Sequence, residues 1–586
     1  MSKRVAVLLM TAVLLILSTQ IGLAAEPDVA AMNAEKYGIF TVLPPLIAIV
    51  LAFITKNVIF SLFIGVFSGA FMLQLSGYNL FKAFIGGFLV LIDQIIANLS
   101  DSWNAGIILQ CLTIGGLIAL ISKLGGAKAV AESLAKRAKS PVSAQLITWV
   151  LGLFVFFDDY ANSLIVGPIM RPVTDKMRIS REKLAFIIDA TAAPIAGIAL
   201  ISTWIGYELS LIKDAYASIG QDVNAYGIFI SSIPYRFYNI LILAFIVFSA
   251  LFLREFGPMR KAEERARAGK VLSDTAKPMV SNEATKLEPK SGIKLNIWNA
   301  IVPIGVLVLA AFAGFYYNGY QAILGGEDQE LIQLVQNAPF SFAALRETFG
   351  ASDASIVLFQ AALLACIVAI IMGVSQKLMS LEEAIDTWIE GVKSLVITAL
   401  ILMMAWSLSS VIKELGTAKY LVSVLSDTIP PFLLPTIIFV MGAIISFATG
   451  TSYGTMGILM PLAVPLAFAI SPEPSYVLVS TGAVLTGAIF GDHCSPISDT
   501  TILSSMGSAC DHLEHVKTQI VYALVVAVAT IVFGYIPVGL GVPIGIVLPL
   551  SIALIGLLVY FIGKPVPAAE ISEEKIVVIE TNHEIG

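Results

Sequence analysis

The sequence predicts an all-α polytopic membrane protein with about 11–13 transmembrane helices in two inverted-topology repeats, with broken helices or re-entrant hairpins at the midplane. Three observations lead to this prediction: apolar runs recur along the chain, charge is scarce, and two long segments resemble each other. Of the 586 residues, 57% are hydrophobic and 13% are charged, and the mean hydropathy is +0.88. A soluble domain carries about 25% charged residues, so this chain cannot cover a soluble surface of its length.

Net charge and cysteine usage exclude two other classes. The formal net charge of −6 excludes a basic nucleic-acid-binding protein, so we expect no nucleic-acid partner. The four cysteines are Cys111, Cys366, Cys494 and Cys510, which lie far apart or inside apolar runs. They therefore predict neither a disulfide framework nor a paired metal site.

The N-terminus, residues 1–25, is expected to be a signal peptide or the first transmembrane helix. Lys3 and Arg4 precede the apolar run 5–17, and small residues end at Ala25. Either alternative leaves residue 26 on the outer side of the membrane.

Apolar runs of usable length follow along the rest of the chain. They lie at 38–55, 58–75, 104–122, 142–157, 184–205, 237–253, 297–317, 355–373, 394–412, 432–448, 455–470, 476–490, 518–537 and 540–562. The stretch 84–97 is shorter and contains Asp93 and Gln94, so we expect it in the interface. About 20 apolar residues cross a bilayer, so some of these runs must be broken.

Basic loops set the predicted orientation. The loops 123–139 and 171–183 carry five Lys and Arg each, and the stretch 254–294 carries ten, so all three are expected in the cytoplasm. The acidic loop 318–354 suits the outer face, and the loop 374–393 is kept inside. This divides the chain into an N-terminal transmembrane half (38–253), a solvated cytoplasmic linker (254–294), a C-terminal transmembrane half (295–562) and a tail (563–586).

The chain repeats itself over roughly 104–206 and 395–506. Tyr160, Pro168 and Pro172 match Tyr453, Pro461 and Pro465 at one constant offset, and Ala193-Pro194-Ile195 matches Ser495-Pro496-Ile497 at another. The loops of the first copy are basic, whereas their counterparts 413–431 and 471–475 are not. An odd number of predicted spans separates the copies. The second copy is therefore expected to be inverted, as in many secondary transporters.

Polar segments interrupt the apolar runs at matching places in both copies, at 156–163 and 448–455 and again at 189–194 and 491–501. Irregular backbone at membrane depth is tolerated only where protein or a wet cavity satisfies it. An aspartate in mid-membrane costs about 2.5–3.5 kcal/mol, so these aspartates must face a polar interior, where carboxylates bind cations or protons.

The predicted cation- and proton-binding residues follow from these segments. The carboxylates are Asp158, Asp159, Asp189, Asp492 and Asp499; the neutral oxygens come from Asn162, Thr449, Thr451, Ser452, Thr455, Ser495, Ser498 and Thr500. His493 is expected to couple to pH. His512 and His515 are expected to be solvated at a helix end, and no metal beyond a transported cation is expected.

Enzyme and ATPase signatures are absent from the sequence. It contains no Walker A loop, no HExxH and no G-x-S-x-G. We therefore expect no enzymatic activity and no cofactor, and uphill transport would use an ion gradient.

The segment Gly491–Ser505, together with 448–455 and 157–162, resembles the NhaC-type Na+/H+ antiporter family. The resemblance covers about 100–540. It implies membership of the ion transporter superfamily and cation-coupled transport across the plasma membrane. The family also includes members that resemble malate/lactate exchangers and sodium-coupled amino-acid carriers.

The leading hypothesis is a Na+/H+ antiporter of the plasma (inner) membrane that works by alternating access. The alternative is a Na+- or H+-coupled carrier of a small organic solute, either a carboxylate or an amino acid. A channel is the third class, disfavoured because broken, inverted hairpins suit occlusion better than a continuous pore. A homodimer is the default assembly.

Overall fold

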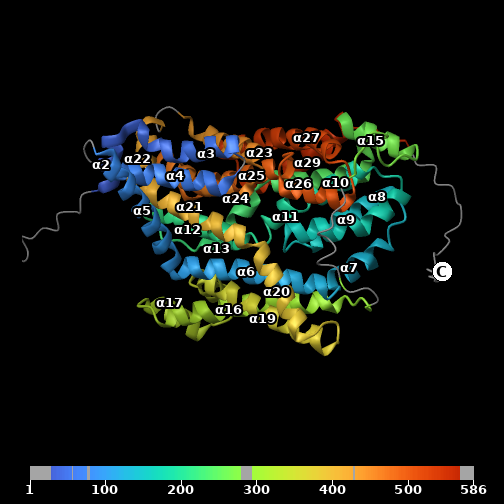
Figure 1. Ribbon diagram of the computed structural model, residues 1–586, viewed down its shortest axis with the longest axis horizontal. Helices are drawn as coiled ribbons and strands as arrows, with labels where there is room; N and C mark the ends of the chain where they lie inside the picture. Colours follow the sequence, from blue (N-terminus) through green and yellow to red (C-terminus); the bar gives the residue numbers. More distant parts are fainter. Residues whose placement is uncertain are drawn as a thin grey trace, which may run out of the picture.

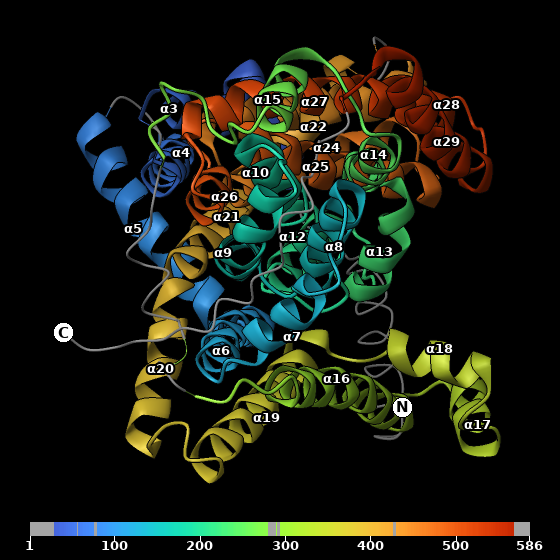
Figure 2. The same ribbon diagram turned by 90° about the vertical axis from the view of Figure 1, so that its right-hand side faces the viewer.

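The computed structural model describes residues 28–55, 57–75, 79–278, 289, 293–425 and 429–567. These residues are almost entirely helical (Figures 1 and 2). The predicted signal peptide or first helix at 1–25, and most of the predicted tail 563–586, lie outside the described residues.

The helices of the first half are bounded as follows. They are α2 (Val29–Tyr37), η1 (Gly38–Val42), α3 (Leu43–Thr55), α4 (Val58–Leu73), α5 (Leu80–Ser100), α6 (Ser102–Lys123), α7 (Gly126–Ala135), α8 (Pro141–Phe154), α9 (Asp159–Lys176), α10 (Arg181–Ala190), α11 (Ala193–Ala196), α12 (Ile205–Ser218), α13 (Ala225–Ser232), η2 (Ile233–Tyr235) and α14 (Phe237–Phe252).

The rest of the chain adds two short strands and a second series of helices. These are β1 (Arg254–Glu255), α15 (Gly257–Arg267), α16 (Trp298–Leu324), α17 (Gln329–Asn337), α18 (Phe342–Gly350), α19 (Ala354–Ser375), α20 (Leu381–Ser394), α21 (Val396–Leu415), α22 (Thr417–Leu425), η3 (Pro431–Leu433), α23 (Leu434–Thr449), α24 (Ser452–Ile470), α25 (Pro474–Cys494), α26 (Asp499–Ser508), α27 (His512–Ala529), η4 (Thr530–Tyr535), α28 (Ile536–Gly539), α29 (Ile544–Ile562) and β2 (Lys564–Pro565).

The number of spans agrees with the prediction. Among the described residues, 11 helices are long and apolar enough to cross a membrane, or up to 12 if Ala225–Tyr235 and Phe237–Phe252, which meet at a bend of 47°, form one span. The stretch 84–97, which we expected in the interface, belongs to a helix that is long and apolar enough to span the membrane. Those residues belong to α5, a candidate span of 21 residues, because the apolar run extends beyond both sides of the polar pair Asp93 and Gln94.

The helices form a broad core with a smaller layer along one edge. α16, α17 and α19 lie together at this edge, next to α6 (Figures 1 and 2). α20 and α21 follow each other almost without interruption over Leu381–Leu415, so α20 connects the edge layer with the core. Several buried residues of α6 are polar, including Asn104, Gln110 and Thr113.

The two segments that resemble each other in sequence also share one order of elements. Each begins with a long helix, α6 or α21, followed by a glycine with φ of 71° (Gly125 or Gly416) and a short helix, α7 or α22. Each then forms a helical hairpin with an irregular tip. The first hairpin is α8–α9 and the second hairpin is α23–α24, and the second arm of each contains two prolines, Pro168 and Pro172 or Pro461 and Pro465.

The expectation of a solvated linker is wrong for its first part. In α15, Glu263 and Arg267 are buried, and the Glu263 carboxylate accepts a hydrogen bond from the Ser180 backbone at 2.8 Å. Arg265 forms an ion pair of 2.8 Å with Glu182 on α10. Long runs of charge normally indicate a solvated segment, but here Arg265 is paired with Glu182 on α10, and Arg267 is paired with Glu263 within α15.

Candidate cation site

The tip of the first hairpin places two aspartates at the start of α9. Asp158 caps this helix, because one of its carboxylate oxygens accepts the backbone N–H of Ala161 at 2.6 Å. Its other oxygen accepts the Thr203 hydroxyl at 3.3 Å. Asp158 and Asp159 are 7% and 6% exposed, so the pair is almost removed from solvent. A helix N-terminus favours negative charge, which offsets part of this cost.

The tip of the second hairpin is built from glycine and hydroxyl residues. α23 ends at Gly450, whose φ of 68° is left-handed, and Thr451 caps α24 by accepting the Gly454 N–H. A Cβ at Gly450 would lie 2.8 Å from the Ile497 carbonyl oxygen, so only glycine allows this close approach. The tip therefore sits directly against the irregular segment between α25 and α26.

The carboxylate of Asp492 is the centre of a compact group of oxygens, which we call the Asp492 cluster. Ser452 and Ser498 donate to its two oxygens at 2.7 Å each, and the Ser498 and Thr500 hydroxyls are 2.9 Å apart. Asp492 lies in the last turn of α25, Ser452 at the start of α24, Ser498 between α25 and α26, and Thr500 in the first turn of α26. Asp492 is 3% exposed. The cluster thus joins one carboxylate to three hydroxyl groups in a nearly dry setting.

A cavity of about 1000 Å³ reaches the first hairpin tip, and we call it the acidic cavity. Asp158, Tyr160 and Asp499 line its inner part, and Asp386 and Glu390 of α20 line it as well. Asp499 is exposed to this space and accepts a hydrogen bond from the Tyr160 hydroxyl. Among the described residues of the lining, Lys393 is the only basic one, and it is paired with Glu390 at 2.6 Å. The lining therefore favours cations over anions.

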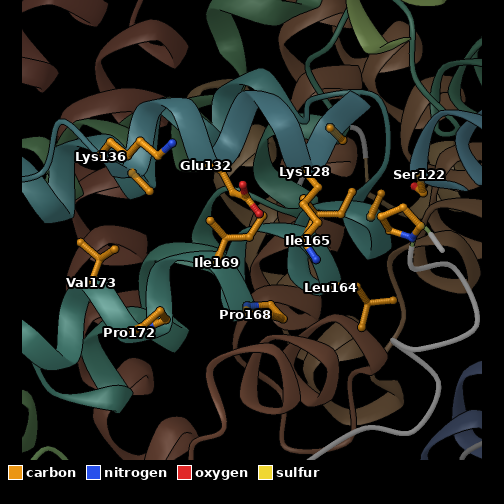
Figure 3. Close-up of a pocket in the computed structure, with 14 residues that line it drawn as sticks. Ser122, Lys128, Glu132, Lys136, Leu164, Ile165, Pro168, Ile169, Pro172 and Val173 are labelled. Atoms are coloured by element: carbon orange, nitrogen blue, oxygen red, sulfur yellow. The ribbon is translucent and has the colours of Figure 1, made fainter. Parts of the chain in front are cut away.

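A second hollow of about 500 Å³ lies on the other side of α9, between this helix and α7 (Figure 3). Lys128 and Glu132 extend into it from α7, above Ile165 and Ile169 of α9. It shares Ala161 and Leu164 with the acidic cavity, so the first turns of α9 are flanked by open space on two sides.

The carboxylates of the two copies lie close enough to repel one another. Asp159 is near enough to Asp158, Asp499 and Asp492 for negative charges on these groups to repel one another. Ser163 of α9 and Ser504 of α26 bring the same two helices together through a hydroxyl contact of 3.0 Å. Four of the five predicted carboxylates are therefore gathered in one region, between the first hairpin and the α25–α26 break.

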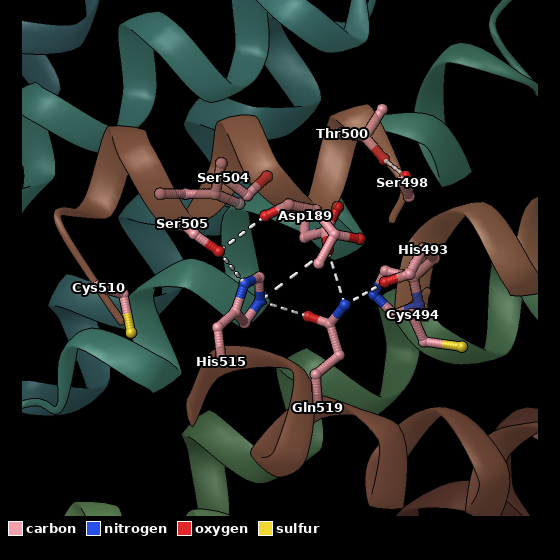
Figure 4. Close-up of polar contacts among 12 residues, drawn as sticks. Asp189, His493, Cys494, Ser498, Thr500, Ser504, Ser505, Cys510, His515 and Gln519 are labelled. Carbon is pink, nitrogen blue, oxygen red and sulfur yellow. Dashed lines mark hydrogen bonds and ion pairs between the residues drawn. The ribbon is translucent and has the colours of Figure 1, made fainter. Parts of the chain in front are cut away.

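Two predicted residues lie apart from this region. Asp189 is completely buried in α10 and contacts α27 rather than the acidic cavity (Figure 4). His493 is also completely buried, with its Nδ1 2.7 Å from the Tyr238 hydroxyl and its ring beside Phe186. The expectation that His515 is solvated is wrong: it is 0% exposed, because it faces Ser505 and Gln519 instead of the helix end.

Most of the other side chains that were predicted to supply oxygens form hydrogen bonds that stabilise the irregular segments. Thr449 and Thr455 donate to carbonyls of their own helical turns, and Ser495 donates to the Phe447 carbonyl at 2.7 Å. Asn162 donates from its amide to the Gly152 and Thr191 carbonyls, at 2.9 and 2.7 Å, and so ties the first hairpin to the end of α10. Its amide oxygen is buried and has no hydrogen-bond donor.

Sequence reasoning missed three residues that complete these arrangements. Thr203 contacts Asp158, Tyr160 contacts Asp499, and Gln519 contacts Asp189. Gln519 offered a signal, because it is an amide within an apolar run, where polar residues face the protein interior. Thr203 offered none, since hydroxyl residues are common near helix ends.

The donor chemistry suits a small hard cation. Carboxylate, hydroxyl and carbonyl oxygens are the ligands that hard cations prefer. Within the described part of the chain, no group of three or more His, Cys, Asp or Glu side chains could hold a metal ion. The oxygens of the Asp492 cluster and the acidic cavity match the ligands that hard cations prefer, and a carboxylate among them can carry a proton instead.

Comparisons with known proteins agree with this chemistry. The sequence profile of the Na+/H+ antiporter family matches residues 3–199 and 195–540. An uncharacterized protein of Haemophilus influenzae is 35% identical over 504 residues, which are 86% of this chain and 91% of that protein. The malate-2H(+)/Na(+)-lactate antiporter of Bacillus subtilis is 34% identical over 179 residues, 30% of this chain and 36% of that protein.

One solved structure has a similar fold. The crystal structure of the YdaH transporter of Alcanivorax borkumensis aligns with a TM-score of 0.53 at 15% sequence identity, covering 84% of this chain and 99% of that one. The likeness concerns the arrangement of helices alone.

Proposed function

Because this chain belongs to the Na+/H+ antiporter family, we propose that it exchanges Na+ for H+ across the plasma (inner) membrane by alternating access. The observation that carries the proposal is the Asp492 cluster, in which one buried carboxylate and three hydroxyl groups meet at a broken helix. A carboxylate at such a break can bind either a cation or a proton. This competition is the simplest physical basis for exchange.

The first and second hairpins are the moving parts in this proposal. We assign them to two inverted repeats, 104–206 and 395–506, within the N-terminal half 38–253 and the C-terminal half 295–562. Asp158, Asp159 and Asp499 attract the cation, and the Asp492 cluster binds it with oxygens from Ser452, Ser498 and Thr500. α6 and α20 border the acidic cavity, and both adjoin loops predicted to be cytoplasmic, so this conformation faces inward.

A second candidate function is favoured by the size of the acidic cavity. A volume of about 1000 Å³ suits a small organic molecule better than a single ion. The B. subtilis relative that carries malate and lactate is similar to this chain over part of its length. The carboxylates that line the cavity disfavour a dicarboxylate, however, so an organic solute would carry a positive group, as an amino acid does.

The test uses proteoliposomes that contain only this protein and a pH-sensitive dye. An imposed pH gradient is challenged with Na+ and then with K+, in the absence of any organic solute. Sodium-specific collapse of the gradient supports antiport. A gradient that collapses only when an amino acid is added together with Na+ supports the second candidate, and no response to any of these refutes both.

A further inference from the structure

A second polar network joins side chains of α10, α26 and α27 (Figure 4). Asp189, His515 and Gln519 are each 0% exposed and line neither of the two cavities described above. Gln519 donates to Asp189 Oδ2 at 2.7 Å and to the His493 carbonyl. Burying three polar side chains costs free energy unless their hydrogen bonds are satisfied. Each of their donors and acceptors is therefore expected to have a partner.

The amide of Gln519 fixes one nitrogen of His515. Both partners of Gln519 Nε2 are acceptors, so this atom is the NH2 group and Oε1 is the carbonyl oxygen. Oε1 lies 2.7 Å from His515 Nε2. An oxygen without hydrogens needs a donor there, and therefore His515 carries a proton on Nε2.

The other nitrogen of His515, Nδ1, competes with two other acceptors for its hydrogen-bond donor. His515 Nδ1 lies 2.8 Å from Ser505 Oγ, but the single Ser505 hydrogen is also within reach of the Thr501 carbonyl at 2.8 Å and of His512 Nδ1 at 3.1 Å. His512 Nε2 must donate to the Pro496 carbonyl at 2.7 Å, so neutral His512 accepts at Nδ1. One hydrogen cannot serve three acceptors. A second proton on His515 reduces this conflict, because Nδ1–H then donates to Ser505 Oγ and only the Thr501 carbonyl and His512 Nδ1 still share the Ser505 hydrogen.

Asp189 supplies the matching negative charge. Its Oδ2 is 3.9 Å from His515 Nε2, and its Oδ1 is buried without a hydrogen-bond donor. A buried carboxylate is strongly destabilising unless it is paired or protonated, and an imidazolium beside it is the nearest available partner. With Asp189 ionised, the pair is balanced when His515 holds two protons.

The network is joined to the Asp492 cluster through α26. Thr501 on α26 donates from its hydroxyl to the Asp492 carbonyl oxygen at 3.1 Å, and Asp492 and Asp499 are near enough to Asp189 for their charges to act on it. The titratable groups packed around His515 and Asp189 are His512 on α27, His493, Asp492 and Cys494 on α25, Asp499 on α26 and Tyr238 on α14. A cation bound at Asp492 neutralises its charge. This weakens the electrostatic attraction that holds the second proton on His515.

We propose that His515, paired with Asp189 and oriented by Gln519, is the proton-binding site of the exchange and is separate from the Na+-binding Asp492 cluster. The inference rests on the proposed antiport and deepens it by placing the exchanged proton on a second, coupled site in place of the Asp492 carboxylate itself. Arrival of Na+ at Asp492 releases one proton from His515 Nδ1, leaving a neutral imidazole with its hydrogen on Nε2. Departure of Na+ restores the imidazolium.

The experiment measures equilibrium binding of radioactive Na+ to the purified full-length protein over a range of pH around neutrality. One competing proton makes the wild-type Na+ dissociation constant rise about tenfold for each pH unit below the titration of the site. In Asp189→Asn and His515→Gln, Na+ binding is expected to persist at high pH, with less than about a twofold change per pH unit. Thr518→Val is the matched control, because this residue lies between His515 and Gln519 on α27 and its hydroxyl bonds only to its own helix.

The outcomes separate the two proposals. Variants that keep the full tenfold dependence would place proton exchange at the Asp492 cluster and overturn the inference, leaving antiport intact. Absence of Na+ binding in the wild type at every pH would overturn the proposed function itself. If neither variant folds, infrared difference spectra of the wild type decide: loss of imidazolium bands on adding Na+ supports the inference, and unchanged imidazole bands refute it.

Discussion

The first and second hairpins share a plan but carry opposite chemistry at their tips. In the first, two carboxylates stand at the start of α9 and one of them, Asp158, lines the acidic cavity; in the second, hydroxyl groups start α24 and face a carboxylate supplied by α25. Their second arms both carry two prolines. Both hairpins therefore place polar residues at the start of their second helix. The position of the aspartates decides which tip attracts a cation and which tip supplies neutral hydroxyl ligands.

Asp492→Asn should have the largest effect on Na+ binding among the variants that distinguish the two tips. The substitution keeps the size of the side chain but removes the charge that Ser452 and Ser498 surround. Losing a charged ligand costs about 3 kcal/mol, which corresponds to roughly 100-fold weaker Na+ binding. Sodium-driven collapse of a pH gradient in proteoliposomes checks this, with Asp328→Asn, a helix cap on α17, as the control. Full exchange by D492N would show that the second hairpin does not serve the cation site.

Asp158→Asn tests whether the first tip acts through charge or through capping. Asparagine caps a helix about as well as aspartate, so the protein should stay folded. Loss of the charge in the acidic cavity should weaken apparent Na+ affinity about tenfold, equivalent to about 1.4 kcal/mol. Initial rates of exchange against Na+ concentration measure the effect. An affinity equal to that of the wild type would mean that the aspartate at the first tip is a cap alone.

Ser452→Ala and Ser498→Ala test the neutral ligands of the second tip. Each removes one hydroxyl that donates to Asp492 at 2.7 Å. A loss of about 1 kcal/mol should weaken Na+ binding about fivefold in each variant. Ser551→Ala is the control, since its hydroxyl bonds to the Val547 and Phe533 carbonyls in the α29 region. Equal binding by the Ser452 and Ser498 variants and the wild type would remove hydroxyl ligands from the site.

Gly450→Ala should have the smallest effect on binding and a measurable one on stability. An alanine in the left-handed backbone conformation costs about 1–2 kcal/mol, and its Cβ would also press against Ile497. Gly541→Ala pays only the backbone cost, because nothing lies within 4 Å of that position. Thermal unfolding in detergent should therefore show a larger drop in Tm for G450A than for G541A. Equal drops would mean that the second tip can move away from Ile497 at no cost.

Local sequence signals predicted the breaks well. The Asp158–Asp159 pair and the glycine- and hydroxyl-rich 448–455 segment fall at the starts of α9 and α24, because capping residues and glycine act within a few positions of where they stand. The grouping of Asp492 with Ser498 and Thr500 followed from their closeness in the chain. The contact with Ser452 depended on the hairpin folding back, which the repeat suggested.

Long-range pairings could not be predicted in the same way. Gln519 and Asp189 are 330 residues apart, and nothing in either local sequence specifies the other. α15 resembles a solvated segment by composition, and its burial depends on partners such as Glu182 that the loop 171–183 and α10 supply. Side chains with a defined local role were predictable, whereas those whose role depends on packing between distant helices were not.

The docking of α15 and β1 has a mechanical consequence. β1 pairs with β2 in register Arg254 to Pro565 and Glu255 to Lys564, and Arg254 also donates to the Tyr560 and Gly563 carbonyls. The last span before the linker and the last span of the chain are thus fastened at one shared end, independently of the covalent connection through 279–288. Two polypeptides made by dividing the chain within 279–288 should therefore reassemble when they are co-expressed. Rocking of one transmembrane half against the other would pivot at the paired strands β1 and β2.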